Sequence, residues 1–186
     1  MSTFFLGIYA LWFISELVMN LSLRAGATDK QGADRSSLVL IWATLAIAIT
    51  GGILLSSWAG LRITGTGWIA YAGLGLIIAG MVFRLLAVAS LGRLFTVNVT
   101  IRRDHALKTD GFYKYIRHPA YAGSLLSFLG FGLSLNNWGS LAVVVIPTAM
   151  AFLYRIRTEE QVLTATFGEA YIAYRRKTRA LIPFIL

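Results

Sequence analysis

Five apolar runs alternate with polar, charge-rich segments along the 186 residues of this chain. They cover residues 3–23, 38–56, 67–91, 120–135 and 138–154. Each run approaches or exceeds the length of helix that crosses the hydrocarbon core of a bilayer. The mean hydropathy of +0.69 and a charged fraction of only 13% are also unlike those of a soluble domain. The pattern predicts an all-α, polytopic membrane protein with five transmembrane helices.

Positive charges gather on one side of the five predicted spans. Lys and Arg are concentrated in the segments 24–37, 92–119 and 155–186, which hold fifteen of the 17 such residues. Because these residues collect in cytoplasmic loops, we expect the N-terminus outside and the C-terminus in the cytoplasm. Trp58, Trp68 and Trp138 then share the outer interface, where indole rings are enriched. The same asymmetry accounts for the net charge of +9 without a nucleic acid partner.

We expect one integral membrane domain over residues 1–186, with two spans in 1–66 and a core in 67–186. Within the core, the polar segments 92–121 and 155–186 face the same side. A site built between them would lie at the inner membrane surface. The chain has no cysteine, which excludes disulfides, zinc–thiolate sites and cysteine nucleophiles. Its first apolar run lacks the basic start and small-residue cleavage site of a cleavable signal, so we expect none.

Both histidines of the chain, His105 and His118, fall in one polar loop, HALKTDGFYKYIRHPAY, at residues 105–121. Two histidines that lie 13 residues apart with no third ligand make a poor metal site, so we expect no metal. A lone histidine is usually structural. Two histidines beside arginine and tyrosines instead favour a binding site.

The same loop carries signals for local structure. Asp110-Gly111 predicts a turn. Pro119 predicts the start of the fourth helix, since proline suits the first helical turn. Arg117 and His118 would then crowd a helix N-terminus, whose partial positive charge and free N–H groups attract anions.

The tail YRIRTEEQVLTATFGEAYIAYRR predicts a helix that leaves the membrane, followed by a second, amphipathic helix. Arg155 and Glu159 are four residues apart on one helical face, with Glu160 beside them. By default such a pair is solvated at the membrane edge. Tyr171 and Tyr174 are expected along the membrane surface.

Two charged residues interrupt the predicted spans. A charge inside a span costs roughly 2.5–3.5 kcal/mol on insertion scales, so it usually has a partner or a function. We expect Glu16 to face the interior of the bundle. Arg84 lies closer to the inner end, from which a long side chain can reach the interface.

Taken together, the loop and tail motifs resemble a known family. The loop carries His105, Leu107, Gly111 and Tyr113 ahead of Arg117-His118-Pro119-Ala120-Tyr121, and the tail carries Arg155, Glu159-Glu160, Phe167-Gly168-Glu169, Tyr171 and Tyr174. In this order they resemble the isoprenylcysteine carboxyl methyltransferase family, including its short prokaryotic members, over residues 84–186. The resemblance implies a helical membrane enzyme that uses S-adenosylmethionine, with a cytoplasmic cofactor pocket formed by 92–121 and 155–186.

The resemblance also implies the roles of particular residues. The cofactor contacts would be His105, Ala106, Leu107, Lys108, Tyr113, His118, Pro119, Ala120, Tyr121 and Glu159, with Asn98, Arg117 and Glu160 as additional candidates. Glu159 would pair with the cationic part of the cofactor. Arg155 corresponds to the arginine on the substrate side and would orient a carboxylate. The implied acceptor is lipophilic, most simply an isoprenylcysteine carboxylate or a lipidated substrate. The implied setting is among the lipids of a prokaryotic inner membrane, with the active site facing the cytoplasm.

Three other readings remain open on the sequence. A phospholipid or small-molecule N- or S-methyltransferase would share the cofactor but not the acceptor. Membrane sterol reductases resemble the same region and use NADPH, although Pro119 after His118 and the RTEE tail favour a methyltransferase. A non-enzymatic scaffold or transporter subunit would not need the loop and tail motifs.

Overall fold

The computed structural model describes residues 3–22, 30–31, 35–92, 100–101 and 107–181. The helices are α1 (Thr3–Ser22), α2 (Arg35–Leu55), α3 (Trp68–Leu91), α4 (Pro119–Ser134), α5 (Trp138–Phe167) and α6 (Glu169–Lys177). Short 3₁₀ turns η1 (Ala59–Leu61) and η3 (Gly111–Lys114) lie between them. A two-residue strand β1 (Lys30–Gln31) pairs antiparallel with β2 (Thr100–Ile101). The fold is all-α as predicted, apart from this one unexpected pairing.

Hydrophobic runs and helix-breaking residues explain the helix boundaries. The first four helices begin and end within three residues of the predicted apolar runs. Pro119 is the first residue of α4, as predicted. The predicted fifth span and the helix that leaves the membrane form one continuous helix of 30 residues, α5. Gly168, with φ of +53°, ends α5 and starts α6, because this backbone conformation suits glycine.

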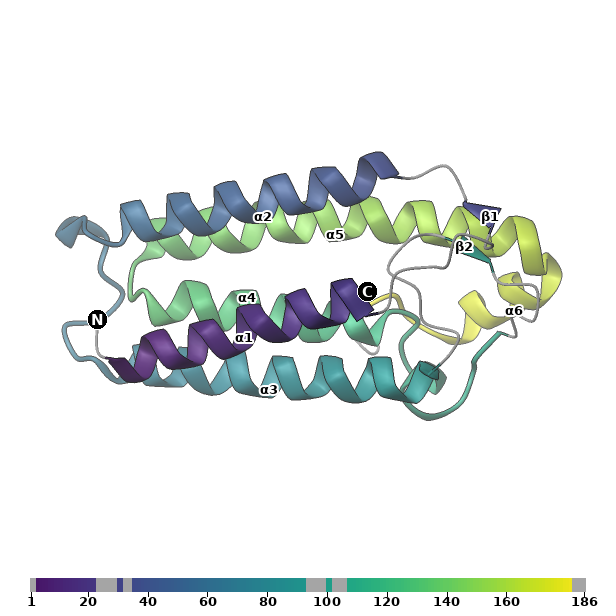
Figure 1. The fold of residues 1–186 in the computed structure, drawn as a ribbon, viewed down its shortest axis with the longest axis horizontal. Helices are drawn as coiled ribbons and strands as arrows, with labels where there is room; N and C mark the ends of the chain where they lie inside the picture. The colour runs from purple at the N-terminus through teal and green to yellow at the C-terminus, as the bar shows by residue number, and fades with distance from the viewer. Residues whose placement is uncertain (1–2, 23–29, 32–34, 93–99, 102–106, 182–186) are drawn as a thin grey trace.

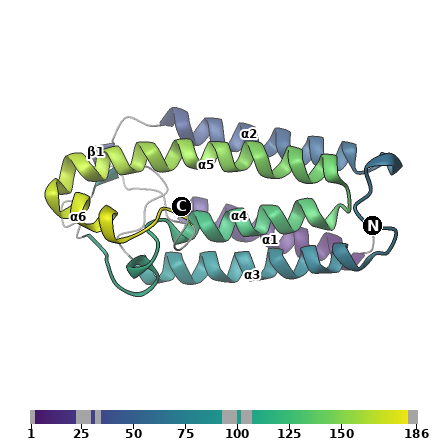
Figure 2. The ribbon, with the colours of Figure 1, turned by 180° about the vertical axis from the view of Figure 1, so that it is seen from behind.

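The helices run lengthwise in alternating directions (Figure 1). Helix α3 packs on α4, α4 on α5, α5 on α2, and α1 on α3. The start of α4, the end of α5, α6 and the β pair all lie at one end of the bundle, and the view from behind shows the same arrangement (Figure 2). The chain therefore gathers its charged loop and tail at a single end.

Glycines bring α3 and α4 close together. A Cβ added to Gly80 would lie 2.5 Å from the carbonyl oxygen of Gly123. A Cβ added to Gly130 would lie 2.5 Å from the carbonyl oxygen of Gly73. Small residues allow membrane helices to approach in this way, where van der Waals packing supplies much of the attraction. This contact fixes the position of α4, and with it the loop that precedes α4.

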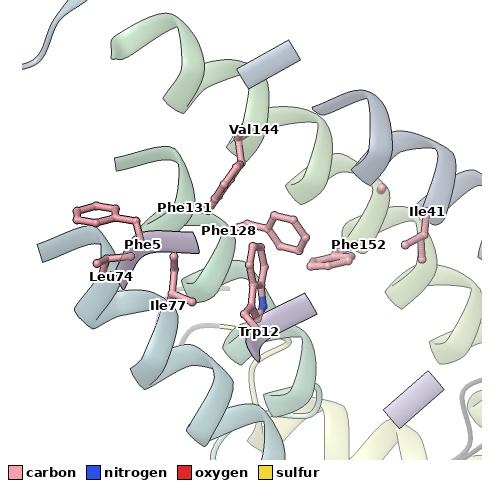
Figure 3. Packing of buried hydrophobic residues seen from close by; sticks show 10 residues of the cluster. Phe5, Trp12, Ile41, Leu74, Ile77, Phe128, Phe131, Val144 and Phe152 are labelled. Carbon is pink, nitrogen blue, oxygen red and sulfur yellow. The ribbon is translucent and has the colours of Figure 1, made fainter. Parts of the chain in front are cut away.

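Aromatic side chains fill the space between α1, α4 and α5 (Figure 3). The rings of Trp12 and Phe128 lie edge to face with centroids 4.8 Å apart. Phe128 also lies edge to face with Phe152, at 6.2 Å. Such arrangements are preferred for aromatic pairs. The aromatic cluster ties the N-terminal helix to the core of the bundle.

The surface of the bundle is apolar, as an integral membrane protein requires. Ile47 and Leu54 on α2 are 72% and 68% exposed. Among the described residues, the helices long and apolar enough to cross a membrane are Thr3–Leu21, Trp68–Leu91 and Trp138–Phe167. Val39–Leu55 is shorter, and α4 has 16 residues. The count of five spans therefore stays a prediction.

The two charges within the predicted spans contact each other. Arg84 Nε lies 2.8 Å from Glu16 Oε1, across the interface of α1 and α3. We predicted an inward-facing Glu16 and an Arg84 that reaches the membrane interface. Glu16 faces α3 within the bundle, as predicted, whereas Arg84 pairs with Glu16. The pairing lowers the cost of placing either charge in an apolar environment.

Candidate active site

The charged loop and tail meet at one end of the bundle. The residues before α4 and after α6 lie side by side, joined by a parallel bridge between Ile116 and Arg179. The backbone N–H of Arg117 donates to the carbonyl of Arg179 at 2.8 Å, and that of His118 donates to Ala180 at 3.0 Å. Segments that lie far apart in the sequence thus build one site. The assignment of this site as a cofactor pocket stays a prediction.

Glu159, on the last turns of α5, is contacted by three side chains. The Tyr121 hydroxyl donates to its Oε1 at 2.5 Å, and Arg155 Nε donates to the same oxygen at 3.2 Å. His118 Nδ1 lies 3.4 Å from the other oxygen, Oε2. The carboxylate is therefore held in one orientation from both α4 and α5. Its side chain still keeps 22% of its surface exposed.

Glu160, the next residue, is surrounded by positive charge. Arg117 Nε donates to its Oε1 at 2.6 Å. Arg175 Nε lies 3.3 Å from its Oε2, and His118 Nε2 lies 3.4 Å from its Oε1. The imidazole of His118 is thus placed between two carboxylates. The Glu160 side chain is only 10% exposed, against 22% for Glu159, and so has less capacity for a ligand.

Arg117 also fastens α6 to the loop. Its Nη1 donates to the carbonyl of Thr178 at 2.6 Å and to that of Arg175 at 3.4 Å. The last carbonyls of a helix lack intrahelical partners, and a basic side chain can satisfy them. The Tyr174 hydroxyl donates to the carbonyl of Tyr113 at 2.6 Å, which adds a second attachment.

Two expectations about exposure are wrong. Arg155 is only 1% exposed, so the Arg155–Glu159 pair is not a solvated pair at the membrane edge. It is buried because α4 packs against α5 and brings the Tyr121 hydroxyl onto the same carboxylate oxygen. Tyr171 and Tyr174 are 1% and 9% exposed and are therefore not spread along the membrane surface. Helix α6 turns these rings inward, toward the loop.

The carboxylates set the charge state of His118. Burial disfavours a charged imidazole, but Glu159 and Glu160 outweigh it and raise the pKa of His118 above its ordinary value. The ring is therefore protonated more readily than a free histidine. Burial, only partly opposed by Arg117, raises the pKa of Tyr174 to about 12, so this hydroxyl stays a hydrogen-bond donor.

The structure brings together six of the residues singled out from the sequence. These are Arg117, His118, Tyr121, Arg155, Glu159 and Glu160. Tyr113 is buried next to them beneath α6. The motif residues therefore form one cluster with Glu159 and Glu160 at its centre.

Other predicted residues lie away from these carboxylates or outside the described residues. Pro119 and Ala120 form the first turn of α4, and Ala120 packs into a buried cluster with Met19, Ala87 and Val88. Lys108 Nζ pairs with Asp110 at 2.9 Å, and Leu107 is half-buried. Asn98, His105 and Ala106 lie outside the described residues. Their predicted contacts with a cofactor stay predictions.

Sequence reasoning missed the pairing of Arg175 and the backbone of residues 178–180 with the loop. No local pattern signals these contacts, since Arg117 and Thr178, for example, are 61 residues apart in sequence. Several N–H groups at the start of α4, expected to be available to an anion, already have acceptors within the chain. The N–H groups of Tyr121 and Ala122 donate to the carbonyl of His118, and those of Arg117 and His118 donate to the tail.

The chemistry of the cluster suits a cationic ligand at Glu159 and an anionic ligand near the arginines. Glu159 is a partly exposed carboxylate with a fixed orientation, which fits an ammonium or sulfonium group. Arg155, one helical turn before it, places a guanidinium next to that position. Such a guanidinium binds carboxylates well.

Comparison with known proteins identifies the family. Residues 73–165, half of the chain, match the model of the isoprenylcysteine carboxyl methyltransferase family. The matched range includes the loop motif, α4 and the Arg155–Glu160 segment. The chain belongs to this family, as the motifs indicated.

Individual relatives support the same family assignment. The chain is 36% identical over 120 residues to protein-S-isoprenylcysteine O-methyltransferase B of Arabidopsis thaliana, covering 63% of this chain and 61% of that protein. It is 37% identical over 116 residues to the protein-S-isoprenylcysteine O-methyltransferase of Schizosaccharomyces pombe, covering 61% of this chain and 49% of that protein. The chain thus spans about half to three fifths of these relatives. Both are eukaryotic, and a prokaryotic membrane stays a prediction.

A solved structure shares the fold. The eukaryotic intramembrane Ras methyltransferase, an isoprenylcysteine carboxyl methyltransferase, superimposes with a TM-score of 0.70 and 24% sequence identity. The match covers 97% of this chain and 65% of that one. This chain therefore shares the fold of that protein over nearly its whole length.

Proposed function

We propose that this protein transfers a methyl group from S-adenosylmethionine to the carboxylate of a lipophilic, isoprenylcysteine-like acceptor at the membrane surface. One observation carries the proposal. The family match at 73–165 encloses the loop and helix residues that converge on Glu159. A scaffold would have no need to hold one carboxylate with a histidine, a tyrosine and an arginine.

We also infer five spans with the N-terminus outside, in the inner membrane of a prokaryote, with the site facing the cytoplasm. The alternating directions of α1 to α5 support an odd number of passes (Figure 1). Trp58, Trp68 and Trp138 are 62%, 60% and 58% exposed at the end of the bundle opposite the site. The basic residues of α6 lie at the end that carries the site.

S-adenosylmethionine would supply an electrophilic methyl group on a sulfonium. Glu159 would bind its cationic part, and His118 and Tyr121 would hold that carboxylate in place. Arg155 would orient the acceptor carboxylate by a bidentate contact. Since Arg155 and Glu159 are neighbours on α5, opposite charges of acceptor and cofactor would be brought together. Positioning of this kind supplies much of the rate of an in-line transfer.

The surroundings of His118 favour a carboxylate acceptor over a thiol or an amine. A carboxylate is already ionised and needs no general base, whereas thiols and amines must lose a proton. Both ring nitrogens of His118 lie 3.4 Å from a carboxylate oxygen, of Glu159 and Glu160 respectively, so the imidazole is already engaged and is poorly placed to take a proton from an acceptor. Burial of the Arg155–Glu159 pair also excludes water from the site. Because separated charges are best solvated in water, its exclusion favours the reaction of an anionic acceptor with a cationic cofactor.

Calorimetry on the detergent-purified protein tests the cofactor. We expect S-adenosylmethionine and S-adenosylhomocysteine to bind and NADPH not to bind. Binding of NADPH alone would replace the methyltransferase with a reductase. If neither class of cofactor bound to folded protein, a non-catalytic role would become the leading one.

Transfer of a labelled methyl group to N-acetyl-S-farnesylcysteine then tests the acceptor. A methyl ester releases volatile methanol in base, whereas N-methyl and S-methyl products do not. We expect base-labile label with the free carboxylate and none with the matching carboxamide. Base-stable label on a parallel acceptor with a free amine or a free thiol, such as S-farnesylcysteine or farnesylthiol, would assign an N- or S-methyltransferase instead.

A further inference from the structure

The ion pair between α1 and α3 lies next to the candidate active site. Arg84 Nε and Glu16 Oε1 are 2.8 Å apart, and the two side chains are 17% and 19% exposed. A charge inside a span usually has a partner or a function. Here each charge has the other as a partner, and Arg84 has a further contact.

That further contact is made with α4. Arg84 Nη1 donates to the carbonyl oxygen of Ala120 at 3.1 Å. The two helices are close enough for this because Gly123 faces Arg84. A Cβ added to Gly123 would lie 2.8 Å from the backbone nitrogen of Arg84. The guanidinium thus holds the first turn of α4 within the RHPAY motif, two residues after His118.

The charge of Arg84 also acts on the loop. The Tyr113 hydroxyl donates to the carbonyl of Ala87, one helical turn after Arg84, at 3.4 Å. Burial raises the pKa of Tyr113, as do Tyr174 and Glu159, while Arg84 acts in the opposite sense. Tyr113 is therefore within electrostatic reach of both Arg84 and Glu159.

A need for packing alone does not explain this pair. Next to it, Met19, Ala87, Val88 and Ala120 already join α1, α3 and α4 through a buried apolar cluster. Well-packed apolar residues often replace a buried ion pair without loss of stability. What a guanidinium adds is a directional bond to one carbonyl of α4.

We propose that Glu16 and Arg84 form a positioning pair for the candidate active site. Arg84 holds the first turn of α4, and Glu16 holds Arg84. That turn places His118 and Tyr121, two of the three partners of Glu159, so the pair sets the orientation of the Glu159 carboxylate. Helix α1, which lies outside the family-matched range 73–165, is thereby part of the machinery. The effect of the pair on cofactor binding rests on the proposed function, in which Glu159 binds S-adenosylmethionine.

Hydrogen exchange tests the hold on α4 without any cofactor. In Arg84→Gln we expect the amides of Tyr121 and Ala122, which donate to the carbonyl of His118, to exchange about tenfold faster. Arg62→Gln removes an exposed arginine at the opposite end of the bundle and should leave these amides unchanged. The far end of α4 should also stay unchanged in both variants. Wild-type exchange at the first turn in Arg84→Gln would overturn the proposal.

Binding of S-adenosylhomocysteine tests the effect on the site. We expect Arg84→Gln and Glu16→Gln to weaken affinity about tenfold, and Arg84→Lys to restore part of it. The double variant should bind no worse than Arg84→Gln, because Glu16 acts through Arg84. The KM for the acceptor should stay unchanged, which a general loss of structure would not allow.

The outcomes separate this inference from the proposed function. A folded Arg84→Gln variant with wild-type affinity would reduce the pair to a structural role, whatever its melting temperature. If the wild-type protein binds no S-adenosylhomocysteine, the proposed function fails. The exchange measurement then decides by itself whether Arg84 positions α4.

Discussion

At the scale of single residues, the candidate site combines an excess of positive charge with one accessible carboxylate. Arg117, Arg155 and Arg175 surround Glu159 and Glu160, with His118 between the two acids. An anionic acceptor would be attracted by this surplus. A cationic cofactor would be repelled everywhere except at Glu159. The two proposed ligands therefore need different residues, and substitutions should separate them.

Glu159→Gln should remove cofactor binding while keeping the shape of the side chain. The neutral amide cannot attract a sulfonium or an ammonium, and it also loses charge-assisted bonds with Arg155 and His118. We expect affinity for S-adenosylmethionine, which carries both cationic groups, to fall at least about tenfold, measured by calorimetry. Glu169→Gln, at an exposed acid of α6, is the matched control and should bind normally. Equal affinity in both variants would refute a role for Glu159 in the cofactor site.

Arg155→Lys should leave cofactor affinity largely intact and reduce turnover. Lysine keeps the charge beside Glu159 but loses the planar pair of donors that orients a carboxylate. We expect kcat/KM for the acceptor to fall about 10²-fold, as small misplacements do. The matched control is Arg157→Lys, two residues away and exposed. Loss of cofactor affinity without loss of fold would assign Arg155 to the cofactor site instead.

The stability of this end of the molecule should depend on pH through His118. Its pKa is raised in the folded state, so its contribution to stability is complete below the unfolded value of about 6.5. That contribution is lost as the pH rises through the raised pKa. The excess melting temperature of the wild type over His118→Gln should therefore shrink as the pH rises above about 6.5. A difference that stays constant or grows would contradict the assigned charge state.

The residues of the site could be found from the sequence, but their partners could not. The motifs drew attention to Tyr121 and Glu159, yet these lie 38 residues apart and meet only because α4 packs on α5. For the same reason the solvated interpretation of Arg155 failed, since helical spacing says nothing about what covers a helix face. Likewise, Glu16 and Arg84 were each noticed as costly, and only the packing of α1 on α3 pairs them.

At the scale of elements, prediction succeeded where a local signal was present. Apolar runs gave four helices to within three residues, and Pro119 marks the predicted start of α4. The pairing of β1 with β2 escaped prediction, since two residues per strand carry no periodic pattern. The inward turn of α6 also escaped, because its tyrosines are compatible with either face of an amphipathic helix.

The contact of α3 with α4 should tolerate a methyl group at one glycine and not at another. In Gly80→Ala the new Cβ would meet the carbonyl of Gly123 at 2.5 Å, so the helices must separate. In Gly75→Ala, on the same helix, nothing lies within 4 Å. We expect Gly80→Ala to lower the melting temperature and weaken S-adenosylhomocysteine binding through the displaced α4, with Gly75→Ala near wild type. Equal behaviour of the two variants would contradict close packing at Gly80.

At the scale of the whole molecule, charge and aromatic residues mark opposite ends of the bundle. The cluster on Glu159 and Glu160 and the basic end of α6 lie at one end. Three exposed tryptophans lie at the other. A protein oriented by its Lys and Arg residues would place the first end in the cytoplasm. An acceptor held in the inner leaflet by its apolar chain would then present its carboxylate at the level of the site.

Labelling of single introduced cysteines should reveal this orientation directly, because the chain itself has none. Gly60→Cys lies at the tryptophan end, where a Cβ has nothing within 4 Å, and Lys177→Cys lies at the exposed end of α6. In intact cells a membrane-impermeant maleimide should modify Gly60→Cys and spare Lys177→Cys. Inside-out vesicles should give the reverse, and detergent should expose both. Modification of both from the same side would mean an even number of spans between them. An even number of spans would contradict the alternating directions of α1 to α5. The assignment of the site to the cytoplasm would then be wrong as well.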